Sequence, residues 1–400
     1  MRVIVVGNGI AGVMCSKFLR DRGLQADIDI FTDEKYDYYP RPNLIEFLAG
    51  RIPENRLFAF KEEWYLEKNL NVHLETPVHS IVSEEGKLVT GGEKEEKYDI
   101  LVLANGSRPF IPPIQGTDKK RVLSLRTLDD CYEIMDCLET HPNVTVLGGG
   151  LLGLEIARAL ITRGVSVQVF EFSPRLLPRQ LDEKGASLLK KQIENMGISI
   201  NLGMTCEEIL GSGEVSGLRF KDGRTFTTEV VIVAAGVKPD VQLAAQAGLR
   251  TERGVMVDEQ LQTSDPKIYA LGDNVEFDGK TYGIIPAAFE QAKAVAAAVA
   301  GEKIEYTGTI PSNSLKVAGL DVTSIGVANP EDNESIELRT FDEKTGVYKK
   351  IVVRENILIG AIVMGTKKRV PDFSRLILEK TDIGRWKERL LEDDFDLSGL

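Results

Sequence analysis

The feature that most constrains the fold of this chain is a glycine-rich turn that occurs twice. Residues 7–12 read GNGIAG and follow the apolar run at 3–6, and residues 148–153 read GGGLLG and follow the apolar run at 144–147. In both turns, glycine occupies the first, third and sixth positions. Each segment therefore predicts a buried strand, a tight turn and the start of a helix.

This spacing has a physical reason when a dinucleotide binds to the turn. The first glycine permits the tight turn, the second lets the backbone approach the pyrophosphate, and the third lets the helix pack against the strand. The pyrophosphate then lies at the helix N-terminus, where unpaired N–H groups favour an anion. One such turn is weak support, because packing alone also selects glycine. Two turns predict a chain that binds two dinucleotides and transfers electrons between them.

An acidic residue is expected about 20 positions beyond each turn, where its carboxylate binds the adenosine ribose. After the first turn, the predicted second strand ends at Asp33 and Glu34, and the spacing leaves both open. After the second turn, the strand predicted at 165–170 ends at Glu171. A carboxylate there binds both ribose hydroxyls and repels a 2′-phosphate, which favours NADH over NADPH, although Arg175 lies nearby.

Composition argues against several classes of partner. The net charge of −12 argues against nucleic acid. No apolar run approaches the roughly 18 residues that span a bilayer, so no membrane segment is predicted. The first strand is predicted to follow Met1 and Arg2 directly, which leaves no room for a signal peptide, and a cytoplasmic location is expected.

Cysteine and histidine form no pattern typical of metal or acid–base sites. The chain has four cysteines without a C-x-x-C pair, and its three histidines lie beside no motif. No metal site and no histidine base are therefore predicted. Core packing is expected for all four cysteines, which are Cys15, Cys131, Cys137 and Cys206.

The C-terminal part of the chain has a different pattern from the rest. From about residue 308, short apolar runs predict strands at 322–327, 335–340, 347–354 and 357–364. A polar helix is predicted at 373–391, followed by an acidic and solvated tail.

Together with the two turns, three further motifs make the chain resemble the two-dinucleotide flavoprotein family that includes glutathione reductase, ferredoxin reductases and NADH oxidases. The motifs are LANG at 103–106, AAG at 234–236 and LGD at 271–273. The resemblance covers residues 1 to about 330. Within the family, the chain is most similar to NADH:rubredoxin reductases and the flavoprotein part of nitrite reductases, through residues 38–44, 48–58 and 282–301.

The resemblance implies a fold and a division into domains. The expected fold class is α/β, with two doubly wound, Rossmann-like nucleotide-binding domains, the second inserted in the first, and a C-terminal α+β domain. The expected FAD-binding domain comprises residues 1–110 and 229–307. The NAD(H)-binding domain is expected at 111–228 and the C-terminal domain at 308–400.

The resemblance also implies that FAD binds at the first turn and NADH at the second. The residues implied for FAD are Gly7, Gly9, Ile10, Ala11, Gly12, Asp33, Glu34, Arg41, Pro42, Val78, Ala104, Asn105, Gly106, Arg126, Asp273 and Pro286. Those implied for NAD(H) are Gly148, Gly150, Leu151, Leu152, Gly153, Glu155, Glu171, Ala235 and Gly236.

Three of these residues have specific expected roles. Arg41 faces the FAD phosphates, where its planar guanidinium suits two oxygens. Asp273 holds the ribityl chain or the pyrophosphate through a shared water, hydroxyl or metal ion, because direct contact between a carboxylate and a phosphate is repulsive. Glu155 accepts a hydrogen bond from the nicotinamide carboxamide, or is simply a carboxylate that the helix dipole favours.

The chain departs from the family pattern at two positions. Relatives that reduce disulfides or peroxides carry a cysteine where this chain has Pro42, so thiolate chemistry is not expected. Asn105 stands where relatives usually carry threonine, but asparagine makes similar local hydrogen bonds, so FAD is still expected.

The function that the resemblance implies is chemistry performed by the flavin. Hydride passes from NADH to FAD, and electrons leave singly to a small iron protein, rubredoxin first. Two alternatives remain open: an NADH oxidase that forms hydrogen peroxide, and a flavoprotein whose redox state gates an interaction. An acidic partner would need a local basic patch, for which the candidates are Lys316, Lys349, Lys350, Lys367, Lys368 and Arg369.

Overall fold

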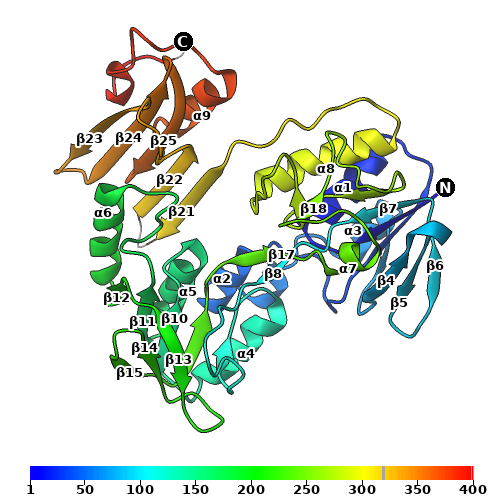
Figure 1. Cartoon of the computed structure of the whole chain (residues 1–400), viewed down its shortest axis with the longest axis horizontal. Coiled ribbons are helices and arrows are strands. Elements are labelled where there is room, and N and C mark those ends of the chain that lie inside the picture. Colours follow the sequence, from blue (N-terminus) through cyan, green and yellow to red (C-terminus); the bar gives the residue numbers. More distant parts are fainter. Residues whose placement is uncertain (318–319, 398, 400) are drawn as a thin grey trace. The chain divides into compact units, whose positions relative to one another are not determined.

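The computed structural model describes residues 1–317, 320–397 and 399, with the backbone alone at 315–317 (Figure 1). The chain divides into two compact units. Unit 1 comprises residues 1–47, 51–108 and 237–309, and unit 2 comprises residues 48–50, 109–236 and 310–400. The chain thus leaves unit 1 and returns to it, which confirms the predicted insertion.

Unit 1 is built on a five-stranded parallel sheet with the order β19-β7-β1-β2-β3. Its strands are β1 (Arg2–Val6), β2 (Asp27–Phe31), β3 (Asn71–His73), β7 (Ile100–Leu103) and β19 (Ile268–Ala270). The middle of β1 is fully buried, as expected for a parallel strand covered on both faces. The first glycine turn follows β1 where the strand order reverses, which is the usual place for a nucleotide in such a sheet.

Unit 2 repeats this arrangement with different residues. Its parallel sheet has the order β12-β11-β10-β16-β9. The strands are β9 (Val122–Leu123), β10 (Asn143–Leu147), β11 (Ser166–Glu171), β12 (Ser199–Leu202) and β16 (Val230–Val233). The second glycine turn follows the middle strand β10, as the first follows β1. The two doubly wound folds that the sequence predicts are confirmed.

The predicted domain boundary at residue 229 is wrong. Strand β16 pairs in parallel with β10, from Val144 opposite Val230 to Leu147 opposite Val233, and so belongs to the second sheet. Unit 1 resumes only at Val237. An apolar run of this kind is suited to a buried strand in either sheet. Only its pairing with β10 shows that it belongs to the second sheet.

Shorter elements complete the two nucleotide-binding folds. The antiparallel sheet β4-β5-β6 comprises Val78–Val82, Lys87–Thr90 and Glu95–Lys97, and the sheet β13-β14-β15 comprises Cys206–Leu210, Gly217–Phe220 and Thr225–Thr227. The two-stranded sheets are β8 (Ser107–Pro109) with β17 (Val237–Pro239), and β18 (Val255–Met256) with β20 (Val275–Glu276). The helices are α1 (Ile10–Asp21), α2 (Asn43–Leu48), α3 (Glu62–Glu67), α4 (Leu128–Leu138), α5 (Leu151–Thr162), α6 (Glu183–Glu194), α7 (Gln242–Gln246) and α8 (Ile285–Val299), with 3-10 turns η1 (Glu54–Arg56) and η2 (Ser83–Glu85).

The C-terminal part of unit 2 is an antiparallel sheet with one main helix, drawn in yellow, orange and red in Figure 1. The strand order is β21-β22-β25-β24-β23, with bounds Ser312–Val317, Leu320–Gly326, Ile357–Met364, Val347–Arg354 and Ile336–Asp342. Helix α9 (Val370–Glu379) packs on β25, and the 3-10 turn η3 covers Arg389–Leu391. Among the described residues, no helix is both long and apolar enough to cross a bilayer.

The predicted helix at 373–391 is wrong in its extent. Helix α9 ends before Lys380, whose φ of 50° lies in the left-handed region and stops the helical hydrogen bonds. Leu390, in η3, is fully buried in the C-terminal core. The polar segment 380–391 therefore continues as a turn that brings the chain back to the C-terminal core. The pattern of polar and apolar residues does not distinguish such a segment from a helix.

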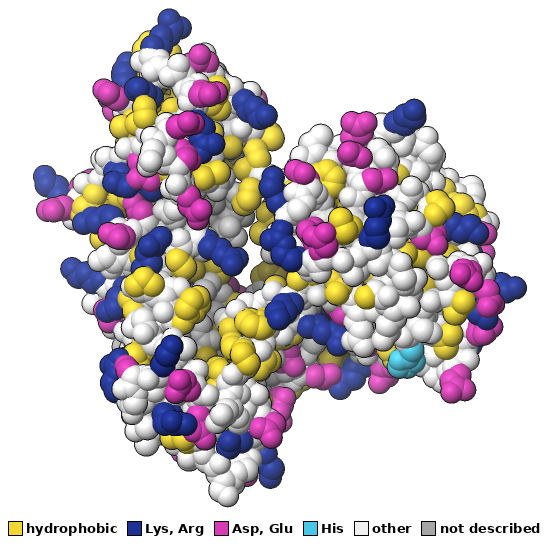
Figure 2. All heavy atoms as spheres, in the orientation of Figure 1, with side chains coloured by type: hydrophobic (Ala, Val, Ile, Leu, Met, Phe, Trp, Pro, Cys, Tyr) yellow, Lys and Arg dark blue, Asp and Glu magenta, His cyan; other side chains and the backbone are white. Residues whose placement is uncertain are grey.

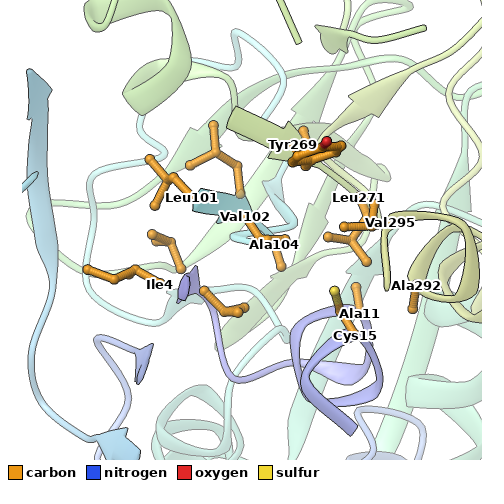
Figure 3. Packing of buried hydrophobic residues seen from close by; sticks show 14 of the residues in the cluster. Ile4, Ala11, Cys15, Leu101, Val102, Ala104, Tyr269, Leu271, Ala292 and Val295 are labelled. Carbon is orange, nitrogen blue, oxygen red and sulfur yellow. The ribbon is translucent and has the colours of Figure 1, made fainter. Parts of the chain in front are cut away.

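The core of unit 1 lies between the central strands and two helices. Figure 3 shows Ala11 and Cys15 of α1 facing Ala292 and Val295 of α8, with Leu271 close by. Small side chains on both helices allow them to pack side by side. Core packing is thus confirmed for Cys15 and also for Cys131, both fully buried, whereas Cys137 and Cys206 are only half-buried.

A buried carboxylate ties three strands of unit 1 together. Asp29 of β2 is 5% exposed and accepts hydrogen bonds from Arg2 Nε at 2.8 Å and His73 Nε2 at 2.7 Å. Burial disfavours the charged carboxylate, but the hydrogen bonds from Arg2 and His73 outweigh it and lower the pKa of Asp29.

Replacing Asp29 with asparagine is expected to lower the free energy of unfolding by about 1–3 kcal/mol at pH 7, because Arg2 loses a charged partner. The lowered pKa means that the carboxylate stabilises the fold above its unfolded-state pKa, and that this contribution is lost as pH falls through the folded-state pKa. The difference from the wild type should therefore shrink below about pH 4. Urea unfolding between pH 7 and pH 3 measures it, and a pH-independent difference would contradict the account.

Candidate functional site

The first glycine of each turn is required by backbone geometry. Gly7 has a φ of 113° and Gly148 has a φ of 123°, values that side chains rarely allow. A Cβ atom on Gly7 would lie 2.3 Å from the carbonyl oxygen of Ala104, and one on Gly148 would lie 2.4 Å from that of Ala234. In both units the turn therefore passes tightly over the end of the neighbouring strand.

The second glycine of each turn faces open space. A Cβ atom on Gly9 or Gly150 would meet no described heavy atom within 4 Å beyond its chain neighbours. Both residues have ordinary extended conformations, with φ of −83° and −77°, so backbone strain does not explain the glycine. The space over the turn fits a ligand that approaches the backbone, as a pyrophosphate does.

The N-termini of the helices that begin at these turns are suited to binding an anion. Neither α1 nor α5 has a side-chain hydrogen bond at its N-cap, and neither has an acidic residue in its first turn. The first N–H groups of each helix are thus left for another acceptor. With the open space over Gly9 and Gly150, these N-termini fit two phosphate-containing ligands.

The structure separates the two acidic residues that the sequence left open. Glu34 lines a pocket with Gly9 and Thr32, whereas Asp33 is exposed and does not line it. We therefore assign the adenosine ribose of the first site to Glu34 as our hypothesis.

Arg41 lies in the same pocket as Glu34. Its guanidinium forms an ion pair with Glu34 at 2.6 Å and donates to the Tyr39 hydroxyl at 3.2 Å. The pKa of Arg41 is raised because Glu34 and Tyr39 outweigh the effect of burial, so the guanidinium stays charged. A fixed cation beside the glycine turn suits a phosphate.

Asp273 is brought to the first turn by its neighbour Gly272. Gly272 has a φ of 94°, and a Cβ atom there would lie 2.9 Å from the Cβ of Ala11 in α1. Its N–H donates to the fully buried Gln291 at 2.7 Å, which fixes the turn. The Asp273 carboxylate accepts from the Ser107 hydroxyl at 2.8 Å.

Asn105 lies at the same edge of the sheet, where its side chain makes hydrogen bonds to neighbouring loops. Its side-chain amide donates to the carbonyl of Asp240 at 2.9 Å and accepts from Asn274 at 3.0 Å. Asn274, which is fully buried, also donates to the carbonyl of Leu103. The asparagine thus makes the local hydrogen bonds expected at this position.

In unit 2, the carboxylate of Glu171 lies against the second glycine turn. It is 6% exposed and accepts the N–H of Gly149 at 2.6 Å and that of Ser173 at 2.8 Å. The nearby Arg175 donates to the carbonyl of Pro178 at 3.2 Å, within its own loop. A negative charge held at this point is the expected partner of ribose hydroxyls and repels a 2′-phosphate.

The other predicted site residues have definite places, and their roles stay predictions. In unit 1, Val78 begins β4, Pro42 precedes α2 and Pro286 lies in the first turn of α8. In unit 2, Arg126 lies before α4 and donates its N–H to Asp130, Glu155 lies in the second turn of α5, and Ala235 and Gly236 follow β16.

Sequence reasoning missed part of the first pocket. Asn8, Tyr36, Asp37, Tyr38 and Tyr39 line it together with the predicted residues. The tyrosines belong to an aromatic run after β2 that looks like core by composition. Asn8 is the variable position between two glycines, where the motif itself specifies no residue type.

The basic patch proposed from the sequence is wrong at three positions. Lys349 is 2% exposed and is paired with Asp393, and Lys350 is 1% exposed and is paired with Glu337 at 2.8 Å. Arg369 is 6% exposed and donates to backbone carbonyls. These cations are used inside unit 2 and are not available to a partner.

Of the remaining candidates, Lys367 and Lys368 are exposed, and Lys367 is paired with Asp321 at 3.7 Å. The side chain of Lys316 lies outside the described residues. Figure 2 shows basic and acidic side chains interspersed over the visible face. Charge type along the sequence does not reveal which lysines are buried in ion pairs.

Two family models match the chain. The model described as pyridine nucleotide-disulphide oxidoreductase matches residues 1–294. The model described as the rubredoxin NAD+ reductase C-terminal domain matches residues 311–381. These matches agree with the two nucleotide-binding folds and the separate C-terminal sheet, and they confirm the resemblance drawn from the motifs.

Individual proteins show the same likeness. The nitrite reductase [NAD(P)H] of Bacillus subtilis is 36% identical over 384 residues, which is 96% of this chain and 48% of that protein, so the chain spans about half of it. The NADH-rubredoxin oxidoreductase of Clostridium acetobutylicum is 30% identical over 382 residues, covering 94% of this chain and 95% of that one. The solved ferredoxin reductase of the CYP199A2 system from Rhodopseudomonas palustris is 28% identical with a TM-score of 0.91, covering 100% and 99% of the two chains.

Proposed function

Since the chain belongs to the pyridine nucleotide-disulphide oxidoreductase family, we propose that it is an FAD-dependent NADH oxidoreductase that passes single electrons to a small iron protein such as rubredoxin. The observation that carries the proposal is the repeated turn. Each copy has open space over its second glycine and an uncapped helix N-terminus. Two such sites in one chain suit two dinucleotides, and electron transfer between them is the simplest use of both.

Unit 1 supplies the FAD site. FAD, when bound, accepts hydride and releases electrons one at a time. The N-terminus of α1 and the backbone at Gly9 hold the pyrophosphate, and Arg41 adds a positive charge. Glu34 accepts hydrogen bonds from the adenosine ribose. Asp273 binds a hydroxyl of the ribityl chain, since direct contact with phosphate is repulsive.

Unit 2 supplies the NADH site. The N-terminus of α5 and the backbone at Gly150 hold the pyrophosphate, and Glu171 accepts hydrogen bonds from the ribose. The carboxylate opposes a 2′-phosphate, so NADH is the preferred donor. Glu155 remains the candidate contact of the nicotinamide carboxamide.

No thiol chemistry is part of the proposal. Burial raises the pKa of Cys15 and of Cys131 to about 12 and that of Cys206 to about 11, so these thiols stay protonated near neutral pH. By the family resemblance, Pro42 stands where members with a redox-active thiol carry cysteine, and proline offers no thiol. These thiols would therefore take no part in the transfer of electrons to the acceptor.

The iron-protein acceptor is supported by the C-terminal domain. Residues 311–381 match the rubredoxin NAD+ reductase C-terminal domain, and the Clostridium acetobutylicum relative is named for rubredoxin. The cytoplasmic location predicted from the sequence is part of the proposal.

The initial rate of NADH oxidation tests the proposal. The FAD-loaded protein is assayed under air and then anaerobically with oxidised rubredoxin, each time with NADH and with NADPH. We expect a rate with rubredoxin well above the rate in air, and a higher kcat/KM for NADH. A rate in air that rubredoxin does not raise, with hydrogen peroxide accumulating, would make the protein an NADH oxidase. Slow reoxidation by every acceptor would favour redox gating of an interaction.

A further inference from the structure

The second residue of the first glycine turn belongs to the pocket of unit 1. Asn8 lies between Gly7 and Gly9 and lines the pocket that also contains Glu34 and Arg41. Asn8 therefore shares this pocket with the glycine turn and with the carboxylate that we assign to the ribose.

One hydrogen bond holds the amide of Asn8, and a second orients the tyrosine hydroxyl that makes it. The backbone N–H of Tyr38 donates to the hydroxyl oxygen of Tyr65 at 3.3 Å, and that hydroxyl donates to Asn8 Oδ1 at 3.0 Å. Tyr65, in α3, is 3% exposed, and burial raises the pKa of its phenol, so the hydroxyl keeps its proton. Because Tyr65 donates to Oδ1, the Nδ2 of Asn8 is directed away from Tyr65.

The nitrogen of this amide is left without a partner. Asn8 Nδ2 is buried and has no hydrogen-bond acceptor among the described residues. A buried donor without an acceptor is destabilising, and such groups are rare in folded proteins. Unit 1 holds this donor in place with a dedicated tyrosine, which is the arrangement expected where a ligand supplies the acceptor.

We propose that Asn8 Nδ2 donates a hydrogen bond to a ribose or phosphate oxygen of the dinucleotide bound in unit 1, and that Tyr65 is the positioning residue that aims it. This rests on the proposed function, which places FAD there. Both kinds of oxygen accept hydrogen bonds, and both belong to the part of FAD that the turn and Glu34 are built to hold.

The dissociation constant of FAD tests the role of Asn8. Holoenzyme is diluted, and release of the flavin is followed by its fluorescence. We expect Asn8→Ala to raise the dissociation constant about 10-fold, as for the loss of one hydrogen bond to a bound ligand. We expect Asn8→Asp to raise it by about 100-fold, because the carboxylate offers no donor and repels phosphate.

A second readout separates ligand binding from folding. Thermal unfolding of the protein freed of FAD should change little in Asn8→Ala, because the variant removes a buried donor that lacks a partner but also removes the acceptor of the Tyr65 hydroxyl. An equal loss of stability with and without FAD would mean that Asn8 is structural, and would overturn the proposal.

The positioning role of Tyr65 needs a double-mutant cycle. Tyr65→Phe alone should weaken FAD binding several-fold, but should add nothing in the Asn8→Ala background, because there is no amide left to aim. Tyr98→Phe is the matched control, since the Tyr98 hydroxyl is buried in the same unit and has no partner among the described residues. Additive effects of Tyr65→Phe and Asn8→Ala would contradict the positioning role.

The outcomes separate this inference from the proposed function. If the wild-type protein binds no FAD, the proposed function fails. If the wild type binds FAD and both Asn8 variants bind it equally well, only the present inference fails. If the Asn8 variants bind FAD more weakly, competition with ADP and with adenosine identifies the acceptor. An affinity loss in the variants for ADP alone indicates a phosphate oxygen, and an affinity loss for both ADP and adenosine indicates a ribose oxygen.

Discussion

Replacing Gly150 with valine is expected to leave the protein folded and loaded with FAD, but to slow the reduction of flavin by NADH by about 100-fold. The Cβ position of Gly150 meets no described heavy atom within 4 Å, and the residue has an extended conformation that valine adopts easily. The new side chain therefore costs the apo fold little. It occupies the space over the second turn, through which the pyrophosphate must approach the backbone.

Anaerobic stopped-flow absorbance of the flavin measures this rate as a function of NADH concentration. Reduction by dithionite serves as a control, because it bypasses the NADH site and should be unaffected. Gly153→Ala is the contrasting variant, since its Cβ would lie 2.1 Å from the carbonyl oxygen of Gly148 and should destabilise unit 2 itself by about 1–3 kcal/mol. Wild-type reduction of Gly150→Val by NADH would show that this turn does not hold the donor.

Replacing Lys350 with glutamate is expected to destabilise unit 2 by about 3–5 kcal/mol, which is typical of breaking a buried ion pair. Lys350 is 1% exposed and pairs with Glu337 at 2.8 Å, and Asp182 lies 3.9 Å away. Asp182 also caps α6 and accepts the hydroxyl of Tyr348 at 2.6 Å. The substitution would place a third carboxylate beside Glu337 and Asp182, at a position where the side chain is 1% exposed.

Lys368→Glu is the matched control for this prediction, because Lys368 is exposed. Its free energy of unfolding should stay within about 0.5 kcal/mol of the wild type. Denaturant unfolding followed by circular dichroism compares the two variants. Equal stabilities would mean that the buried pair contributes nothing. The comparison also shows which residues can be used to map the surface that binds the electron acceptor. Charge reversal at the exposed Lys367 and Lys368 tests binding of a partner, whereas charge reversal at the buried Lys350 or Arg369 changes the stability of the fold.

Much of the architecture is visible in the sequence because it depends on local pattern. The two turns at 7–12 and 148–153 need glycine at fixed spacing, and both form the predicted strand-turn-helix units. The alternating runs beyond residue 320 are strands β22 to β25. In each of these cases the signal lies within a few residues of its structural consequence.

Other features depend on pairing between distant residues, which no local pattern encodes. The run at 230–233 joined the second sheet through its register with β10, and Lys350 became a core residue through Glu337 and Asp182. Our hypothesis that Glu34 and not Asp33 binds the ribose rests likewise on which of the two residues lines the pocket.

The sequence by itself determined that this chain holds two dinucleotide-binding turns, because close approach of a backbone to a phosphate restricts residue type at fixed positions. Only the tertiary structure decided which charges remain available to a ligand or partner. Burial and ion pairing are set by segments that lie far apart in the chain, as with Tyr65 and Asn8 or Lys349 and Asp393. The chemistry of a charged or polar side chain depends on what the fold places beside it.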